Sequence, residues 1–336
     1  MVPQSHLLEA TLRLSGATLN LPGLARLARF ATATPHAASW RGWLARWLGH
    51  AELANAPPAS IVALTVSAAQ IAAAQSVWLA QPLHLLASVH GVHLPPQGLL
   101  RLAQAEQLEL ARSFATTFAA SGYGLIPLAT GAFLLTAPSV PGEVHTADPA
   151  ECAGATLSEA LPQGPGAGSL RRVGVEIEMW LHAQPLNVAR ERAGALPISA
   201  LWLWGGGPPW AARARRGAAA DRHVLSDDPY VQGLAQLAGA PSGPLPESLQ
   251  AQPLESARVL AQLPVAPPVR AEHEPGSLAP ALERLDREWV APAAAAVARG
   301  ELAELTLVSE RSALSLTAHS SLKLWRRARA PLHALQ

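Results

Sequence analysis

The sequence has a single cysteine, Cys152, and a single lysine, Lys323, among its 336 residues. One cysteine excludes an internal disulfide framework and a cysteine-based metal cluster, which is typical of proteins in a reducing compartment. We therefore expect a cytoplasmic protein. Charged residues make up only 15% of the chain and the formal net charge is +1. Because no basic field exists to hold a phosphate backbone, we expect no nucleic-acid partner.

Long uninterrupted apolar runs are also lacking. Residues 1–16 have no basic stretch followed by an apolar one and carry Glu9 within their hydrophobic part, so we expect no secretory signal. Residues 53–100 contain no Asp, Glu, Lys or Arg, yet glutamines and five prolines interrupt them. Since proline breaks helices, we expect no membrane partner and no membrane span here. We predict instead a buried strand over residues 61–67, followed by a short buried helix.

Short β-rich runs alternate with helical stretches along the chain, a pattern typical of helices that cover a largely parallel sheet. We expect one large α/β domain over residues 1–336, with a mostly parallel central sheet flanked by helices. Linkers rich in Pro, Gly and Ser are predicted near residues 137–142, 162–168 and 240–253. Strands are predicted over residues 6–10, 61–66, 83–88, 198–204, 258–263, 302–308 and 313–317. Helices are predicted over residues 99–120, 169–182 and 277–299, the last ended by Gly300 and kinked or restarted by Pro292.

The densest motif covers residues 184–210, where a helical turn, a strand and three glycines follow one another. Gly205, Gly206 and Gly207 would present backbone N–H groups at a sheet edge, where open α/β folds bind ligands. Asn187 and Arg190 lie three residues apart and would offer an amide and a guanidinium to a phosphate or carboxylate. These five residues are our candidate ligand contacts.

A second interpretation of the same motif is structural and, from the residues alone, is slightly favoured. In it the glycines form a turn after a buried strand, and Arg190 belongs to an ion pair within the protein. The segment matches neither the dinucleotide-binding glycine fingerprint nor the P-loop, because the glycine spacing differs and no lysine is present.

Two further clusters have spacings that occur in metal sites. They are His84, His90 and His93, and Asp221, His223, Asp227 and Asp228. The histidines have no carboxylate near them in sequence, and the acidic cluster is surrounded by arginines, so we expect core or solvated histidines and surface ion pairs. No Gly-x-Ser-x-Gly elbow occurs. We therefore assign no metal ligand and no catalytic residue.

Residues 184–210 resemble the archaeal-type cofactor-independent phosphoglycerate mutases of the alkaline-phosphatase-like superfamily. That family has a helix ending in His-Pro-x-Asn-x-x-Arg, then Gly-x-x-Pro-Ala-Asn and a strand reading Ile-Trp-Leu-Trp-Gly-x-Gly. The matching residues are Pro185, Asn187, Arg190, Gly194, Pro197, Trp202, Leu203, Trp204, Gly205 and Gly207, with Gln184 in place of the histidine. The resemblance extends through residues 145–168 and, more weakly, to residues 83–137 and 285–308.

A closer resemblance is to the RpfE-type bacterial regulatory proteins, which are often labelled phosphoglycerate mutases. They share the Trp-x-Trp-Gly-Gly-Gly strand and a Trp-Arg-Arg tail, present here at residues 325–327. Both resemblances imply an alkaline-phosphatase-like core, which we expect to be degenerate in this chain.

The resemblance also implies which residues the mutase reaction needs. The mutases hold two divalent metals with Asp and His ligands, including an aspartate near the N-terminus and a final Asp-His doublet. Here the only aspartates are Asp148, Asp221, Asp227, Asp228 and Asp286, and no Asp-His doublet occurs. Ala25 stands where the family has an early aspartate. Because paired divalent ions need several anionic ligands, we expect no cofactor and no phosphoserine chemistry.

The function predicted from the sequence is that of a non-catalytic or residual phosphoglycerate-mutase-like protein with a regulatory or small-anion-binding role. Its expected partners are a small phosphorylated or carboxylated metabolite, or another protein. One alternative is an active metal-dependent phosphomutase or phosphatase, an isomerase in the first case, with two divalent ions such as manganese. Another is a protein-interaction scaffold.

Overall fold

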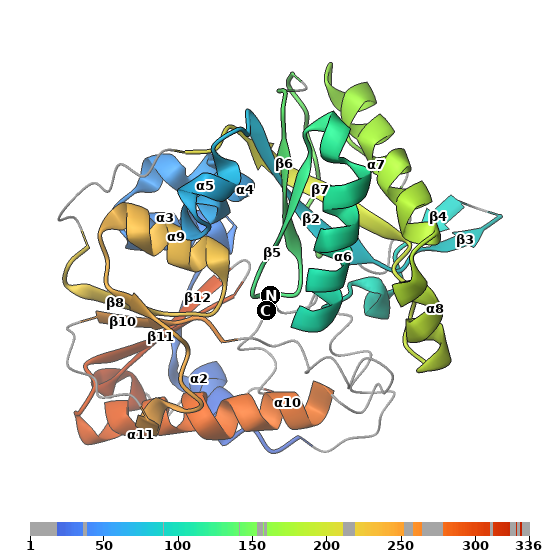
Figure 1. Ribbon diagram of the computed structural model, residues 1–336. Coiled ribbons are helices and arrows are strands. Elements are labelled where there is room, and N and C mark those ends of the chain that lie inside the picture. The colour runs from blue at the N-terminus through green and yellow to red at the C-terminus, as the bar shows by residue number, and fades with distance from the viewer. Residues whose placement is uncertain are drawn as a thin grey trace. The chain divides into compact units, whose positions relative to one another are not determined.

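The computed structural model describes residues 19–35, 39–89, 91–140, 142–152, 157, 160–210, 219–251, 258–263, 278–309, 312–322, 327 and 330. The protein is a mixed α/β structure that divides into two compact units (Figure 1). The first unit contains residues 1–55, 218–226 and 240–336, and the second contains residues 56–217 and 227–239. The single domain and the linkers expected from the sequence stay predictions.

The second unit is built on a four-stranded sheet with the order β5-β6-β2-β7. Its strands are β2 (Ser76–Leu83), β5 (Gly124–Pro127), β6 (Phe133–Ala137) and β7 (Ala200–Gly207). All three strand pairs are antiparallel. A separate antiparallel hairpin joins β3 (Leu86–Ser88) to β4 (Gly91–His93). The helices are α4 (Pro58–Val62), α5 (Ala68–Ile71), α6 (Gln104–Thr117), α7 (Ala167–His182), α8 (Pro185–Arg192) and α9 (Pro229–Ala238).

Helices cover both sides of this sheet. α6 and α7 pack on one face, where Phe114 of α6 meets Trp180 of α7 edge to face at a centroid distance of 5.3 Å, over a cluster that includes Trp78 and Leu203. α4 packs against β2, β7 and α9, and Figure 1 draws α4 and α9 on the opposite side from α6 and α7. Burial on both faces explains why β6 is apolar at nearly every position rather than alternating.

The first unit holds two three-stranded sheets. The antiparallel sheet has the order β1-β12-β11, and the parallel sheet has the order β10-β8-β9. The strands are β1 (Thr32–Pro35), β8 (Arg222–Leu225), β9 (Ser242–Gly243), β10 (Arg258–Ala261), β11 (Glu304–Val308) and β12 (Ser312–Thr317). The helices are α2 (Pro22–Phe30), α3 (Trp40–Trp47), α10 (Leu278–Leu285) and α11 (Ala291–Arg299), with a π-helical turn (Asp286–Val290) between the last two.

The π-helical turn has a local cause in Pro292. Proline has no N–H to donate, and its ring clashes with the carbonyl four residues earlier, so a regular α-helix cannot pass through this position. The Ala291 N–H bonds to the Asp286 carbonyl, five residues back, and the helix then continues to Arg299. Gly300 ends it at φ +77°, as expected from the sequence. The expected interruption by Pro292 is therefore confirmed, in the form of a widened turn.

The expectation of a mostly parallel central sheet is wrong for the described strands. Parallel pairing occurs there only among β8, β9 and β10, while the largest sheet is antiparallel throughout. A β5-β6 hairpin, closed by the short turn before Phe133, supplies two of its four strands. Alternation of strands and helices in the sequence does not reveal this, because the direction of a strand depends on its partner and not on its own residues.

The predicted strand over residues 61–66 is also wrong. Ile61 and Val62 lie in α4, and a 3-10 turn (Ala63–Thr65) follows. Pro58 supplies a helical φ at the first position of α4, and Ile61 is fully buried by helix packing against α9, where Gly233 approaches the Ile61 carbonyl. The short helix expected next is α5, which is mostly exposed rather than buried.

Most other predicted elements are confirmed with shifted ends. The predicted strands over residues 198–204, 258–263, 302–308 and 313–317 overlap β7, β10, β11 and β12, and the three predicted helices overlap α6, α7 and the α10–α11 helix. The predicted strand over residues 83–88 is split, because β2 ends at Leu83 and β3 begins at Leu86. The prediction for residues 6–10 lies outside the described residues. Among the described helices, none combines the length and the apolar character that crossing a bilayer would require.

Candidate functional site

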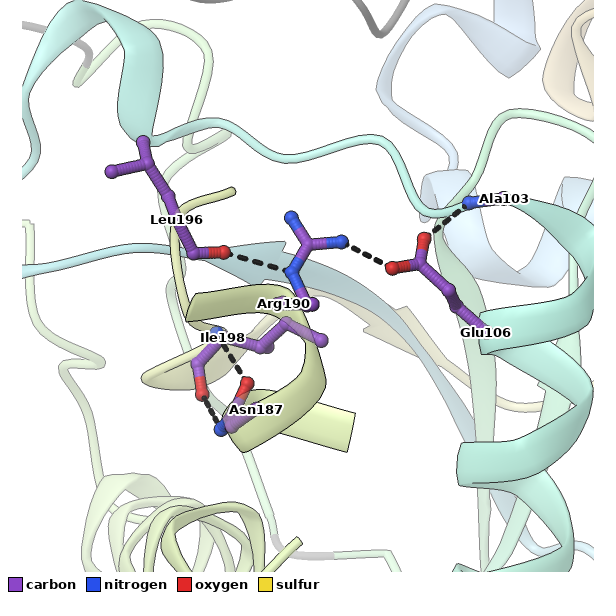
Figure 2. A network of polar contacts seen from close by, with 6 residues as sticks. All are labelled: Ala103, Glu106, Asn187, Arg190, Leu196 and Ile198. Atoms are coloured by element: carbon purple, nitrogen blue, oxygen red, sulfur yellow. Dashed lines mark hydrogen bonds and ion pairs between the residues drawn. The ribbon is translucent and has the colours of Figure 1, made fainter. Parts of the chain in front are cut away.

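The side chain of Asn187 joins α8 to the start of β7 (Figure 2). Its amide nitrogen donates to the carbonyls of Leu181 at 3.0 Å and Ile198 at 2.9 Å, and its amide oxygen accepts the Ile198 N–H at 2.8 Å. The side chain thus pairs with the Ile198 backbone as a neighbouring strand would. Its polar atoms are used within the protein.

Arg190 is buried, with only 6% of its surface exposed. Its Nε donates to the Leu196 carbonyl at 2.8 Å, and its Nη1 lies 2.5 Å from Oε1 of Glu106 on α6 (Figure 2). The other carboxylate oxygen of Glu106 accepts the Ala103 N–H at 2.8 Å and so caps the start of α6. A buried guanidinium is costly unless a carboxylate balances its charge, and Glu106 does so here.

Gln184, which stands where the mutases have a histidine, is also held inside the unit. Its side-chain oxygen accepts a hydrogen bond from the Ser113 hydroxyl at 2.8 Å, and its nitrogen donates to the Trp180 carbonyl at 3.0 Å. The indole N–H of Trp180 completes the network by donating to Ser113 at 3.2 Å. These contacts tie α6 to the junction between α7 and α8.

The three glycines of β7 each have a packing reason. Between the pairs Val77–Gly207 and Leu79–Trp204 the register shifts by one residue, which marks a β-bulge, and Gly205 has a φ of +61°. A Cβ at Gly206 would lie 2.2 Å from the indole ring of Trp78, and one at Gly207 would lie 2.7 Å from both Pro57 and Ser60. Only glycine therefore fits between the bulged strand, Trp78 and the start of α4.

The glycine backbone is also bonded in part to a neighbouring loop. The Gly205 N–H donates to the Thr146 hydroxyl at 3.0 Å, and the Trp202 indole N–H donates to the Ala147 carbonyl at 3.0 Å. The loop that contains Thr146 therefore lies along β7. The Gly205 N–H, which the sequence suggested as an anion donor, already has an acceptor.

The five candidate residues do not come together at one point. Asn187 contacts Ile198, just before β7 begins, whereas Gly205 lies seven residues further along the chain. At about 3.3 Å per residue an extended segment of this length spans roughly 23 Å. One small anion cannot reach both ends. The ion pair expected in the structural interpretation of Arg190 is present, and anion binding by these residues stays a prediction.

Glu106 is the functional partner that the sequence did not reveal. It lies 84 residues from Arg190 in the chain, in a helix recognised only by its apolar spacing. The one available signal was its position three residues after Ala103 at a helix start, where an acidic side chain caps backbone N–H groups.

The histidine and aspartate clusters have structural contacts. The Nδ1 atom of His84 lies 2.9 Å from the Pro197 carbonyl, and the Nε2 atom of His93 lies 2.9 Å from the Ser88 hydroxyl within the β3-β4 hairpin. His90 lies outside the described residues. Asp228 caps α9 by accepting the Tyr230 N–H at 2.8 Å. Across the described part of the chain, no three His, Cys, Asp or Glu side chains are grouped as metal ligands would be. The expected lack of a cofactor stays a prediction.

A cavity of about 560 Å³ lies in the first unit, between the start of α2 and the α10–α11 helix. Its wall includes Asp286, whose two carboxylate oxygens accept the N–H groups of Gly23 at 2.9 Å and Leu24 at 2.7 Å. Burial raises the pKa of Asp286, and these two hydrogen bonds oppose the rise. At the rim Arg299 forms a two-point ion pair with Glu301. The lining carries three acidic side chains and two arginines, so the cavity has little net charge with which to attract an ion.

No protein-family model matches the chain, and no curated protein matches it. Among solved structures, the chain is similar to the cofactor-independent phosphoglycerate mutase from Thermoplasma acidophilum DSM 1728. That likeness has a TM-score of 0.39 and 16% sequence identity, and it covers 94% of this chain and 86% of the mutase. A protein from Pyrococcus horikoshii is similar with a TM-score of 0.38 and 14% identity, over 82% of this chain and 72% of that one.

Proposed function

We propose that this protein is a non-catalytic relative of the cofactor-independent phosphoglycerate mutases that acts in regulation by binding a partner. The proposal includes an alkaline-phosphatase-like ancestry and a place among the RpfE-type regulatory proteins. The motif over residues 184–210 supports this relationship, because its helix, glycine and strand residues follow the family's order. The part of the proposal that assigns binding rather than catalysis rests on the contacts of the aspartates.

The single observation that carries the proposal is the use of the five aspartates by the fold. Asp148, Asp228 and Asp286 accept backbone N–H groups within turns or at helix starts, and Asp221 lies 3.6 Å from the Arg222 guanidinium. Asp227 adjoins the capping residue Asp228 and also has an interaction partner. A two-metal phosphotransfer site needs several carboxylates directed at the same two ions. Aspartates whose oxygens accept hydrogen bonds in caps and turns are not directed at a shared pair of ions.

The state of Arg190 supports a scaffolding role for the segment that resembles the mutases. The charge of its guanidinium is balanced by Glu106, and Asn187 is bonded to the backbone of Ile198. In a phosphate site both side chains would instead be directed at the ligand. Among the binding roles, these contacts favour a protein partner over a small anion at Arg190.

Metal content and isomerase activity of the purified full-length chain test the proposal. After dialysis against manganese, we expect far less than one equivalent of bound metal and no conversion of 3-phosphoglycerate to 2-phosphoglycerate above a mock purification. Stoichiometric metal together with turnover that a chelator abolishes would overturn the proposal. That outcome would establish the alternative, a metal-dependent phosphomutase or phosphatase whose ligands are Glu and His.

Thermal unfolding separates the two binding roles. We expect no shift in the melting temperature of the wild-type chain with 3-phosphoglycerate or inorganic phosphate. The matched variant is Arg190→Lys, which keeps the positive charge but not the two-point geometry. A saturable stabilisation of the wild type that is lost in this variant would replace the protein-binding role with anion binding at Arg190.

A further inference from the structure

The outer face of α7 carries an apolar pair that no described residue covers. Val175 is 53% exposed and Met179, one turn later, is 64% exposed. The inner face of the helix is fully used, because Leu170, Ile177 and Trp180 are buried in the core cluster with α6 and the sheet. At 100° per residue, Val175 and Met179 point directly away from that core. The outer face of the helix therefore carries two exposed apolar side chains that the fold does not bury.

The exposed face has the spacing of a helix-pairing seam. Gly168, Arg172, Val175, Met179 and His182 follow one another at intervals of four and three residues. This is the spacing that keeps a stripe of side chains against a second helix. A Cβ at Gly168 would meet nothing within 4 Å, so the start of the stripe is an open, flat place on the helix.

Two opposite charges lie beside the apolar pair, and neither has an oppositely charged partner among the described residues. Arg171 and Glu178 flank the seam on the same side of the helix. Within the described part of the chain, Arg171 makes only a 3.4 Å hydrogen bond to the Ala167 carbonyl, and no ion pair involves either residue. Partial burial raises the pKa of the Glu178 carboxyl, so a cation placed beside it would favour its ionised form.

A two-fold axis through this face would give each of these groups a partner in a second copy of the chain. The pairs Arg171 with Glu178 and Gly168 with Met179 are each centred within one residue of Gly174. In an antiparallel pair of α7 helices crossing at that point, Arg171 of one copy lies across from Glu178 of the other, and the reverse contact follows by symmetry. Met179 of each copy then lies across from Gly168 of the other, where no side chain stands in its way.

We propose that α7 is a self-association surface, and that its occupant is α7 of a second copy of this chain in antiparallel orientation. The argument is the charge complementarity of the helix with itself, together with the match of a protruding Met179 to an open Gly168. A single 16-residue helix is a small interface, so we expect a weak dimer with a dissociation constant on the order of micromolar. The inference goes beyond the proposed function, because self-association does not depend on whether the chain is catalytic.

Reversal of the two charges tests the pairing. Sedimentation velocity of the full-length chain from about 2 to about 200 μM should show the wild type passing from monomer to dimer. Arg171→Glu and Glu178→Arg each place like charges across the axis twice, so each should weaken the dimer at least about tenfold. The double variant R171E/E178R exchanges the charges and should restore the dimer to within about threefold of the wild type.

The control is Arg46→Glu, which reverses an exposed arginine on α3 that has no ion pair with any residue the structure describes, and it should leave the dimer unchanged. Gly168→Leu supplies an independent test, because it fills the place of Met179 from the second copy while leucine favours the helix within the monomer. It should weaken the dimer, with an unchanged circular dichroism spectrum. A monomer at every concentration, a larger assembly, or a dimer that neither single charge reversal weakens would overturn the proposal.

Discussion

Nη1 of Arg190 on α8 lies 2.5 Å from Oε1 of Glu106 at the start of α6, so one ion pair joins helices that are 84 residues apart in sequence. The guanidinium is buried and also donates to the Leu196 carbonyl, while Glu106 also caps α6. One contact thus fixes the end of α8, the loop that leads to β7 and the beginning of α6. The stability of the second unit should depend on it.

Replacement of Arg190 by alanine should therefore destabilise the protein. The change leaves the Leu196 carbonyl and one oxygen of Glu106 without these donors. The free energy of unfolding should fall by about 2–3 kcal/mol, and not by more, because Glu106 retains some access to water. Urea unfolding followed by tryptophan fluorescence measures it. The matched control is Arg192→Ala at an exposed position on the same helix, expected to change stability by less than about 0.5 kcal/mol. Equal effects of the two variants would contradict a structural ion pair.

Asn187→Asp should destabilise the protein more than its small change in shape suggests. The amide nitrogen of Asn187 donates to two carbonyls, Leu181 and Ile198, and a carboxylate oxygen in its place would face both without a proton. We expect the free energy of unfolding to fall by about 2–4 kcal/mol at neutral pH, which is more than for Asn187→Ala. The reason is that repulsion between the carboxylate and the two carbonyl oxygens adds to the loss of the hydrogen bonds. Part of the loss should be regained at acidic pH, where the new carboxyl is protonated. Urea unfolding of both variants at two pH values checks this.

Two glycine-to-alanine changes should alter the stability of the protein in opposite directions. At Gly206 the added methyl group would lie 2.2 Å from the Trp78 ring, so Gly206→Ala should cost about 2 kcal/mol or more, or prevent folding. At Gly174, within α7, nothing lies within 4 Å of the added carbon, and alanine favours the helix by about 0.5–1 kcal/mol. Melting temperatures of the two variants measure the difference. A stable Gly206→Ala protein would refute the close packing of β7 on Trp78.

Asp286 should make the first unit less stable as the pH rises. Burial raises its pKa above the ordinary value of 3.8, despite the hydrogen bonds from Gly23 and Leu24 that lower it. The folded state therefore holds the proton more tightly than the unfolded state, and this contribution to stability is lost as the pH rises through the folded pKa. The free energy of unfolding, measured relative to the non-titrating Asp286→Asn, should fall from about pH 3.8 upward and then level off.

The sign of that pH dependence decides between two physical effects. If the two backbone hydrogen bonds outweighed burial, the stability of the wild type relative to Asp286→Asn would rise with pH instead. Asp286→Asn should itself be less stable, because its amide nitrogen would face either the Gly23 or the Leu24 N–H in place of an acceptor.

Cys152 should react slowly with thiol reagents in the folded protein. It is buried, its Sγ lies 3.6 Å from the Asp148 carbonyl, and burial raises its pKa, so little thiolate is present at neutral pH. Labelling with a chromogenic disulfide at pH 8 should be much slower in buffer than in denaturant. A fast reaction in the native state would contradict the packing of this thiol against Leu83 and Trp202.

The elements that the sequence predicted well have strong local signals. The helix over residues 99–120 was predicted from apolar side chains at helical spacing, and β7 from an apolar run that ends in glycines. The error at Ile61 and Val62 has an equally local origin, because β-branched residues favour strands but are also buried in helices that begin with proline. β2, β5 and β6 were missed or misplaced, since short buried strands lack a clear alternation.

By itself, the sequence determined that this chain has one cysteine, few charges and only five aspartates, and that glycines follow a buried strand. These are properties of composition and local order. Only the tertiary structure decided that Glu106 pairs with Arg190, that the central sheet is antiparallel, and that Gly206 accommodates Trp78 rather than a ligand. The physical reason is that each of these depends on which distant segments pack together, and such packing is set by the burial of the whole core rather than by the spacing of neighbouring residues.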